Sequence, residues 1–243
     1  LKKNTIRNYE FILTRFQAHF GDIELSVINS DDILEFMTKV SGSSKQNTKK
    51  LRFTLLTAFF NYIKNSIDPA FKNPCDNQAL KRLFRAGKNI QFKILEKDIV
   101  DEIIFRTQNQ RNRIMLELMA RGCMRIGEVL NLTPMDIDAR KVIVQDPKSG
   151  KDFETVFLPQ KVIDRMKKYI QDNGIETDSK IFPITYAGAR LVVKKAGDLV
   201  DTKVEPHDLR RHAATYASRS GTPLEIVSKV LLRHSNLSTT QRY

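Results

Sequence analysis

The last tyrosine of the sequence lies in a setting that suits attack on a phosphodiester. Tyr243 follows His234 by nine positions and comes directly after Arg242. The pKa of a phenol is ordinarily about 10, so the oxygen needs a neighbouring base to become a nucleophile near neutral pH. Fixed guanidinium groups can neutralise the negative charge that develops on the phosphate oxygens. A tyrosine, a histidine and arginines in one site would therefore suit phosphoryl transfer.

The stretch PHDLRRH supplies candidate phosphate ligands. Pro206 favours the first turn of a helix, and His207 and Arg210 then share one face because they are three positions apart. Arg211 lies near that face, whereas His212 points away from it. A histidine and a bidentate arginine on one face can hold a phosphate between them, although a surface helix with basic residues shows the same spacing.

A second arginine occurs in the apolar stretch RGCMRIGEVLNL. Arg125 and Glu128 are three positions apart there. An arginine in apolar surroundings is at least partly buried and needs an anion. Glu128 either forms a structural ion pair with Arg125 or orients it toward a ligand phosphate, and the two interpretations are compatible.

The elements that must position these residues are mostly helical after Leu95. Helical patterns cover residues 161–170, 186–199, 207–220 and 224–232. Two β-prone runs, 142–144 and 154–157, are joined by Asp-Pro-Lys-Ser-Gly-Lys, which predicts a hairpin with its turn near Ser149 and Gly150. Because a two-stranded hairpin is marginal by itself, we expect it to pack against helices.

The first ~85 residues show helical spacing only. The third helix opens with cations on its first turns, which oppose the helix dipole, and a phosphate backbone lying there would offset that cost. A basic linker is expected over residues 86–91. A solvated charged face explains any one of these lysines equally well, but the cluster favours DNA contact. The predicted DNA-binding residues are Lys45, Lys49, Lys50, Arg52, Arg85 and Lys88.

Composition narrows the class of partner. The 243 residues include 41 Lys and Arg against 28 Asp and Glu, a formal net charge of +13, which favours nucleic acid as the partner. No apolar run reaches the ~18 residues of a membrane span and no signal peptide is legible, so we expect no membrane partner and a cytoplasmic protein. Cys75 and Cys123 have no second ligand at zinc spacing and are expected to be ordinary thiols. Without a carboxylate cluster or a glycine-rich phosphate loop, we expect no metal and no cofactor.

Four motifs occur in one order along the chain: Arg-Ile-Gly-Glu-Val, a lysine in a β-hairpin, His-Asp-Leu-Arg-Arg-His, and His-Ser-Asn-Leu-Ser-Thr-Thr-Gln-Arg-Tyr. Together they resemble the tyrosine recombinase or phage integrase family, strongly over Leu95–Tyr243 and more weakly over the first ~88 residues. The resemblance implies a mainly α fold with a small β-hairpin or sheet in its C-terminal domain. It implies a two-domain DNA clamp, with residues 1–88 as an all-helical core-binding domain and residues 89–243 as the catalytic domain.

The resemblance also implies roles for single residues. Arg125 and Arg210 would grip the scissile phosphate, and His234 would donate a hydrogen bond to it. Tyr243 would be the nucleophile, with His207 as its general base. The hairpin lysine that protonates the leaving 5′-oxygen would be Lys148, which lies beside small residues at the turn, although Lys151 lies close enough to compete.

One departure from the family pattern is visible. Where the family usually has Leu-Gly-His, this chain has Leu232-Arg233-His234. The departure adds a bulky cation beside the expected site and concerns the local backbone at Arg233 rather than the assignment of His234.

Three functions fit these observations to different degrees. The favoured one is a site-specific DNA recombinase that cuts and rejoins strands through a 3′-phosphotyrosine, acting as a homo-tetramer on double-stranded DNA with inverted-repeat core sites, with possible accessory DNA-bending proteins. A type IB topoisomerase-like enzyme that nicks, swivels and reseals as a monomer would use the same chemistry. A non-catalytic sequence-specific DNA-binding protein fits the charge but leaves the arginines, lysine, histidines and tyrosine unexplained.

Overall fold

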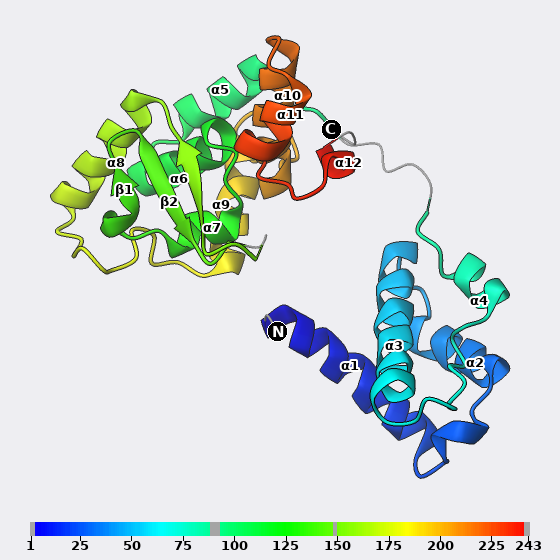
Figure 1. Ribbon diagram of the computed structural model, residues 1–243. Helices are drawn as coiled ribbons and strands as arrows, with labels where there is room; N and C mark the ends of the chain where they lie inside the picture. Colours follow the sequence, from blue (N-terminus) through cyan, green and yellow to red (C-terminus); the bar gives the residue numbers. More distant parts are fainter. Residues whose placement is uncertain (1–2, 88–92, 148–149, 241–243) are drawn as a thin grey trace. The chain divides into compact units, whose positions relative to one another are not determined.

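The computed structural model describes residues 3–87, 93–147 and 150–240 (Figure 1). The chain divides into two compact units, Leu1–Gln91 and Phe92–Tyr243, close to the boundary expected after residue 88. Most of the expected linker over residues 86–91 lies outside the described residues. In the part of the chain that is described, no helix is both long and apolar enough to cross a membrane.

The first unit is all helical and has an aromatic core. Its elements are α1 (Lys3–Phe20), η1 (Leu25–Val27), α2 (Ser30–Ser41), α3 (Gln46–Ser66) and α4 (Gln78–Leu83). Asn29 starts α2 through a capping box, in which its side chain accepts from the N–H groups of Asp31 and Asp32 and the Asp32 carboxylate accepts from the Asn29 N–H. Phe16 packs edge to face on Phe36 and Phe60, so α1, α2 and α3 share one core.

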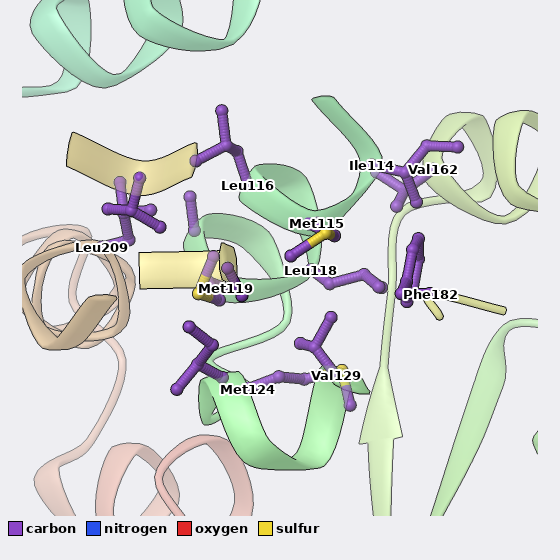
Figure 2. Packing of buried hydrophobic residues seen from close by; sticks show 14 of the residues in the cluster. Ile114, Met115, Leu116, Leu118, Met119, Met124, Val129, Val162, Phe182 and Leu209 are labelled. Atoms are coloured by element: carbon purple, nitrogen blue, oxygen red, sulfur yellow. The ribbon is translucent and has the colours of Figure 1, made fainter. Parts of the chain in front are cut away.

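The second unit is built around α6. Its elements are α5 (Lys97–Arg106), α6 (Gln110–Arg121), α7 (Ile126–Asn131), η2 (Pro134–Asp136), β1 (Ile137–Asp138), β2 (Lys141–Gln145), β3 (Phe153–Phe157), α8 (Gln160–Asp172), α9 (Tyr186–Asp198), α10 (Pro206–Arg219), α11 (Leu224–Ile226), η3 (Val227–Leu231) and α12 (Leu237–Thr240). Every residue of α6 from 114 to 120 is buried. Figure 2 shows why: Leu209 of α10 and Val162 of α8 lie on different sides of α6. Because α8 and α10 both pack on α6, segments that are distant in the sequence are held in fixed positions by one helix.

A small antiparallel sheet has the strand order β1-β2-β3. Val142 pairs with Val156 and Val144 pairs with Glu154. The predicted hairpin is therefore present, with each strand longer than expected, and the short strand β1 was not predicted. Val142, Val144 and Val156 are buried on one face, and by alternation Glu154 points to that same buried face.

The segment with the helical pattern over residues 224–232 is helical from residue 224 to residue 231, but it is not one regular α-helix. A single turn of α-helix, α11, leads directly into the π-helix η3. The N–H of Leu232 donates to the carbonyl of Val227, five residues back, at 2.8 Å. Short π-helical turns are often found at functional sites, and this one ends at Leu231, two residues before Arg233.

Candidate active site

Arg210 is the buried centre of a cationic cluster. Only 1% of its surface is exposed. Its Nη1 donates to the carbonyl of Cys123 and its Nη2 to the carbonyl of Leu232. Burial, followed by the positive charges of Arg125 and Arg233, lowers the pKa of Arg210 to about 10. The Arg210 guanidinium therefore joins the segment of Cys123, which precedes Arg125, to the segment of Leu232, which precedes His234.

Arg125 is the N-cap residue of α7 and is held by Glu128. Its backbone N–H donates to Oε2 of Glu128 at 2.9 Å, and its guanidinium Nη1 pairs with Oε1 of the same carboxylate. The ion pair expected from the spacing is thus present. Burial alone would raise the pKa of Glu128, but Arg233 and Arg125 together hold it below its usual value. Glu128 is therefore an anion that fixes both the backbone and the side chain of Arg125.

Arg233 is buried against two carboxylates. Its Nη2 lies 2.6 Å from Oε2 of Glu128 and its Nε lies 2.9 Å from Oε2 of Glu154. The side chains of all three residues are at most 7% exposed. The φ angle of Arg233 is 52°, in the left-handed region where a residue with a Cβ costs about 1–2 kcal/mol relative to the right-handed one. The unusual backbone suspected from the Leu-Arg-His sequence is present.

His234 lies beside this cluster with one ring nitrogen engaged. Its Nδ1 is 2.9 Å from Oγ1 of Thr240, and the same hydroxyl is hydrogen-bonded to Oγ of the buried Ser228 at 2.7 Å. Burial, followed by the charges of Arg210, Arg125 and Arg233, lowers the pKa of His234 to about 4. His234 is therefore neutral at pH 7, and its Nε2 is the ring nitrogen that is not used by Thr240.

Comparisons with known proteins identify the family of the chain. The model of the phage integrase family matches residues 93–243, more than half of the sequence. The chain belongs to the phage integrase family. It is 29% identical to a tyrosine recombinase of Thermosipho africanus, covering 99% of this chain and 88% of the relative, and 29% identical to the tyrosine recombinase XerA of Pyrococcus horikoshii, covering 99% and 82%.

Two solved structures show the same fold. One is the XerH site-specific recombinase bound to a palindromic difH substrate, with a TM-score of 0.78 and 21% identity over 99% of this chain and 76% of that chain. The other is a lambda integrase dimer bound to a COC′ core site, with a TM-score of 0.76 and 17% identity over 100% of this chain and 89% of that chain. The family, the mainly helical fold with a small sheet, and the activity class of a tyrosine-type site-specific DNA recombinase are confirmed.

The histidines and arginines of α10 in this recombinase differ in burial and in their partners. His207 is exposed while Arg210 is buried. Arg211 bonds Asp208 and the carbonyl of Lys93, which places its guanidinium in a separate contact. His212 is buried with Nδ1 2.8 Å from the carbonyl of Leu95, consistent with the expectation that it points elsewhere. Helical spacing determines the direction in which each side chain points. How deeply each side chain is buried depends on the segments that pack against α10.

Several predicted site residues lie outside the described residues. These are Tyr243, Lys148 and, among the DNA-binding candidates, Lys88. The competing lysine, Lys151, is described and is exposed next to Gly150, whose φ angle is 83°. Four predicted members of the site, Arg125, His207, Arg210 and His234, are described, and Arg125, Arg210 and His234 belong to one electrostatic cluster.

The predicted DNA-binding cations of the first unit differ among themselves. Arg52 is half-buried, donates to the carbonyl of Val40 at 2.8 Å and to Oγ of Ser44 at 3.1 Å, and lies over the ring of Phe11. It therefore joins α3 to α2, to the turn before α3 and to α1, a structural role that the sequence did not predict. Lys45, Lys50 and Arg85 are exposed and Lys49 is half-buried.

Sequence reasoning did not find Glu154, Thr240 and Ser228. The sequence does contain a signal for Glu154. It is two positions from the apolar Val156 in a predicted strand, so both side chains point to the same face, and a buried carboxylate needs a cation. Thr240 and Ser228 carry no such signal, since each is one hydroxyl residue among several.

Proposed function

We propose that this recombinase cleaves and rejoins double-stranded DNA through a covalent 3′-phosphotyrosine bond to Tyr243. The observation that carries the proposal is the cluster of Arg125, Arg210 and His234, which comes from α7, α10 and the segment after η3 and shares one electrostatic environment. Two guanidinium groups and a neutral imidazole from three segments suit one small anion, and the scissile phosphodiester is the anion that a DNA recombinase must bind.

The arginines supply charge stabilisation in this proposal. Negative charge grows on the two nonbridging oxygens as Tyr243 Oη attacks phosphorus, and guanidinium groups that are already fixed need no reorganisation to meet it. Arg210 is held by two backbone carbonyls and Arg125 by Glu128, so both are fixed before DNA arrives. Neutral His234 donates a hydrogen bond to a phosphate oxygen when its proton is on Nε2.

Proton transfers complete the reaction. His207 takes the proton of Tyr243 Oη while the new phosphorus–oxygen bond forms. The bond to the 5′-oxygen breaks, and Lys148 protonates that oxygen so that it leaves as a hydroxyl. The reverse sequence, with a 5′-hydroxyl from another strand as the attacking group, releases Tyr243 and rejoins the DNA. No metal and no external energy source enters these steps.

The wider assembly is also part of the proposal. The basic residues Lys45, Lys49, Lys50, Arg85 and Lys88 would contact the DNA backbone from residues 1–88, acting as a core-binding domain, while residues 89–243 catalyse cleavage. The two DNA-bound structural neighbours support duplex core sites as the substrate class. A homo-tetramer on two inverted-repeat sites, with possible DNA-bending accessory proteins and no membrane partner, would carry out exchange in the cytoplasm.

The test begins with selection of bound duplexes from a random-sequence pool, followed by a nick placed one to several nucleotides from each possible scissile position. Trapping on the nicked duplex should give a covalent protein–DNA band that is absent with Tyr243→Phe, while binding of the intact duplex is unchanged because the ring remains. An adduct that persists in Tyr243→Phe would contradict the assignment of the nucleophile.

Product analysis separates the recombinase from its two alternatives. Paired sites on linear DNA should yield products of recombinant length. Relaxation of supercoiled DNA by a monomer without such products would indicate a nicking-closing enzyme, and binding without any adduct would indicate a non-catalytic DNA-binding protein.

A further inference from the structure

Arg233 occupies an unusual position in the active-site cluster. It takes up a left-handed backbone conformation that glycine adopts without strain, and it places a guanidinium between Glu128 of α7 and Glu154 of β3. The distance of 3.5 Å from its Nη2 to the carbonyl of Cys123 brings it to the same oxygen that accepts from Arg210. Arg233 thus touches every segment that holds the two phosphate-gripping arginines.

The charges of the cluster explain why a cation is needed there. Arg125, Arg210 and Arg233 face Glu128 and Glu154, so three guanidinium groups meet two carboxylates and one positive charge remains. A phosphodiester carries one negative charge and would balance the cluster. Without Arg233, the buried carboxylate of Glu154 would have no dedicated cation, and a buried carboxylate without one draws the nearest guanidinium toward itself.

We propose that Arg233 is a positioning residue for DNA cleavage, one that engages Glu154 and the second oxygen of Glu128 so that Arg125 and Arg210 stay available to the scissile phosphate. This inference rests on the proposed function. Arg233 also joins strand β3, and with it the hairpin of Lys148 and Lys151, to the backbone of His234. It need not touch the DNA, since it acts through the two carboxylates and the arginines beside them.

The choice of substitution follows from the backbone. Arg233→Gly removes the guanidinium and also relieves the left-handed conformation, so the loss of the cation is not confounded by backbone strain. Glu154→Gln in the same chain then removes the carboxylate that Arg233→Gly leaves unpaired. A matched control is Arg165→Ala, because Arg165 pairs at 2.6 Å with Glu117, a carboxylate that is also about 5% exposed but lies in a different part of the unit.

The measurement is the single-turnover rate of covalent adduct formation on saturating nicked duplex at several pH values. Arg233→Gly should be slower by about 10- to 100-fold at pH 8, the range typical for loss of an outer positioning contact. The deficit relative to the parent protein should shrink as the pH falls, because protonation of the unpaired Glu154 releases the arginines. In the described residues, the groups that face Glu154 are the charged Arg233 and the titratable His234, with Glu128, Arg125 and Arg210 beyond Arg233.

The double variant supplies the decisive comparison. Arg233→Gly with Glu154→Gln should recover most of the lost rate and should show no pH-dependent deficit. Arg165→Ala should lower the free energy of unfolding without changing the rate or its pH profile. If Arg233→Gly does not fold, Arg233→Lys replaces it, and a smaller deficit with the same pH dependence is expected because one ammonium group cannot bridge both carboxylates.

The outcomes are separable from those of the proposed function. A parent protein that forms no Tyr243-dependent adduct would contradict the proposed function. A parent protein that forms the adduct, together with Arg233→Gly that cleaves at the parent rate, would overturn the inference alone. A deficit that is equal at every pH and persists in the double variant would also overturn it, since that is what general loss of packing would give.

Discussion

The hydroxyl of Thr240 is hydrogen-bonded to Nδ1 of His234 at 2.9 Å and to the hydroxyl of Ser228 at 2.7 Å. Ser228 lies in the π-helix η3 and its backbone carbonyl accepts from the N–H of His234 at 2.9 Å. These three bonds join η3, the loop of His234 and α12, the helix three residues before the proposed nucleophile, into one unit.

Thr240→Val should therefore weaken catalysis from outside the reacting atoms. Valine keeps the shape but removes the hydroxyl, which leaves Ser228 and His234 each short of a partner, and the free energy of unfolding should fall by about 1–3 kcal/mol. The rate of adduct formation should fall by roughly 10-fold. Thr239→Val is the matched control because Thr239 is exposed, and it should change neither quantity. Equal effects of the two substitutions would show that the hydroxyl of Thr240 does not position His234.

Replacement of either of the two arginines that we propose bind the scissile phosphate by lysine should strongly slow cleavage. Arg125→Lys and Arg210→Lys should each slow adduct formation by at least about 100-fold, since a single ammonium cannot reproduce a planar fork of donors. Arg211→Lys should cleave at close to the parent rate, because the Arg211 guanidinium bonds Asp208 and the carbonyl of Lys93. A larger loss with Arg211→Lys than with Arg210→Lys, measured on nicked duplex, would reverse the assignment.

The general acid can be identified with a leaving group that needs no proton. If Lys148 protonates the departing 5′-oxygen, Lys148→Ala should be slow on normal DNA and largely rescued when that oxygen is replaced by sulfur. Lys151→Ala should be near normal on both substrates. Rescue confined to Lys151→Ala would transfer the role to Lys151, and rescue in neither would assign it to another residue.

The lowered pKa of His234 predicts how stability depends on pH. The pKa is about 4 in the folded protein against an ordinary 6.5. Between these values the unfolded chain binds more protons at this position than the folded chain, so the free energy of unfolding rises with pH over this window and levels off above it. Urea unfolding at pH 4.5 to 7.5 should show a shallower rise in His234→Gln. Parallel curves for His234→Gln and the parent would contradict the prediction.

DNA affinity should depend steeply on salt. With about six phosphate contacts, the logarithm of the association constant should fall against the logarithm of the salt concentration with a slope near −5. Replacing the exposed Lys50 with Gln should reduce the magnitude of the slope by about 1 if Lys50 contacts a phosphate. A flat response of the parent protein would mean that the net charge of +13 is not used on DNA.

Much of this protein could be predicted from residue types and spacing. The ion pair of Arg125 with Glu128 follows from helical spacing in an apolar stretch, and the β-hairpin follows from two β-prone runs around a turn sequence. Both are local features, in which the partners are few residues apart and backbone geometry alone brings them together. The order of the motifs along the chain also indicated the protein family, which the comparisons confirm.

Tertiary structure alone decided the burial and partners of the cationic cluster. Arg210 is buried because α10 packs on α6, and its bonds reach carbonyls 87 and 22 residues away in the sequence. The two carboxylates of Arg233 lie 105 and 79 residues away. No periodicity links residues at such separations, because their contact depends on how helices and a sheet pack. The sequence by itself determined which residues can grip a phosphate, and the packing around α6 determined which of them meet and which carboxylates hold them.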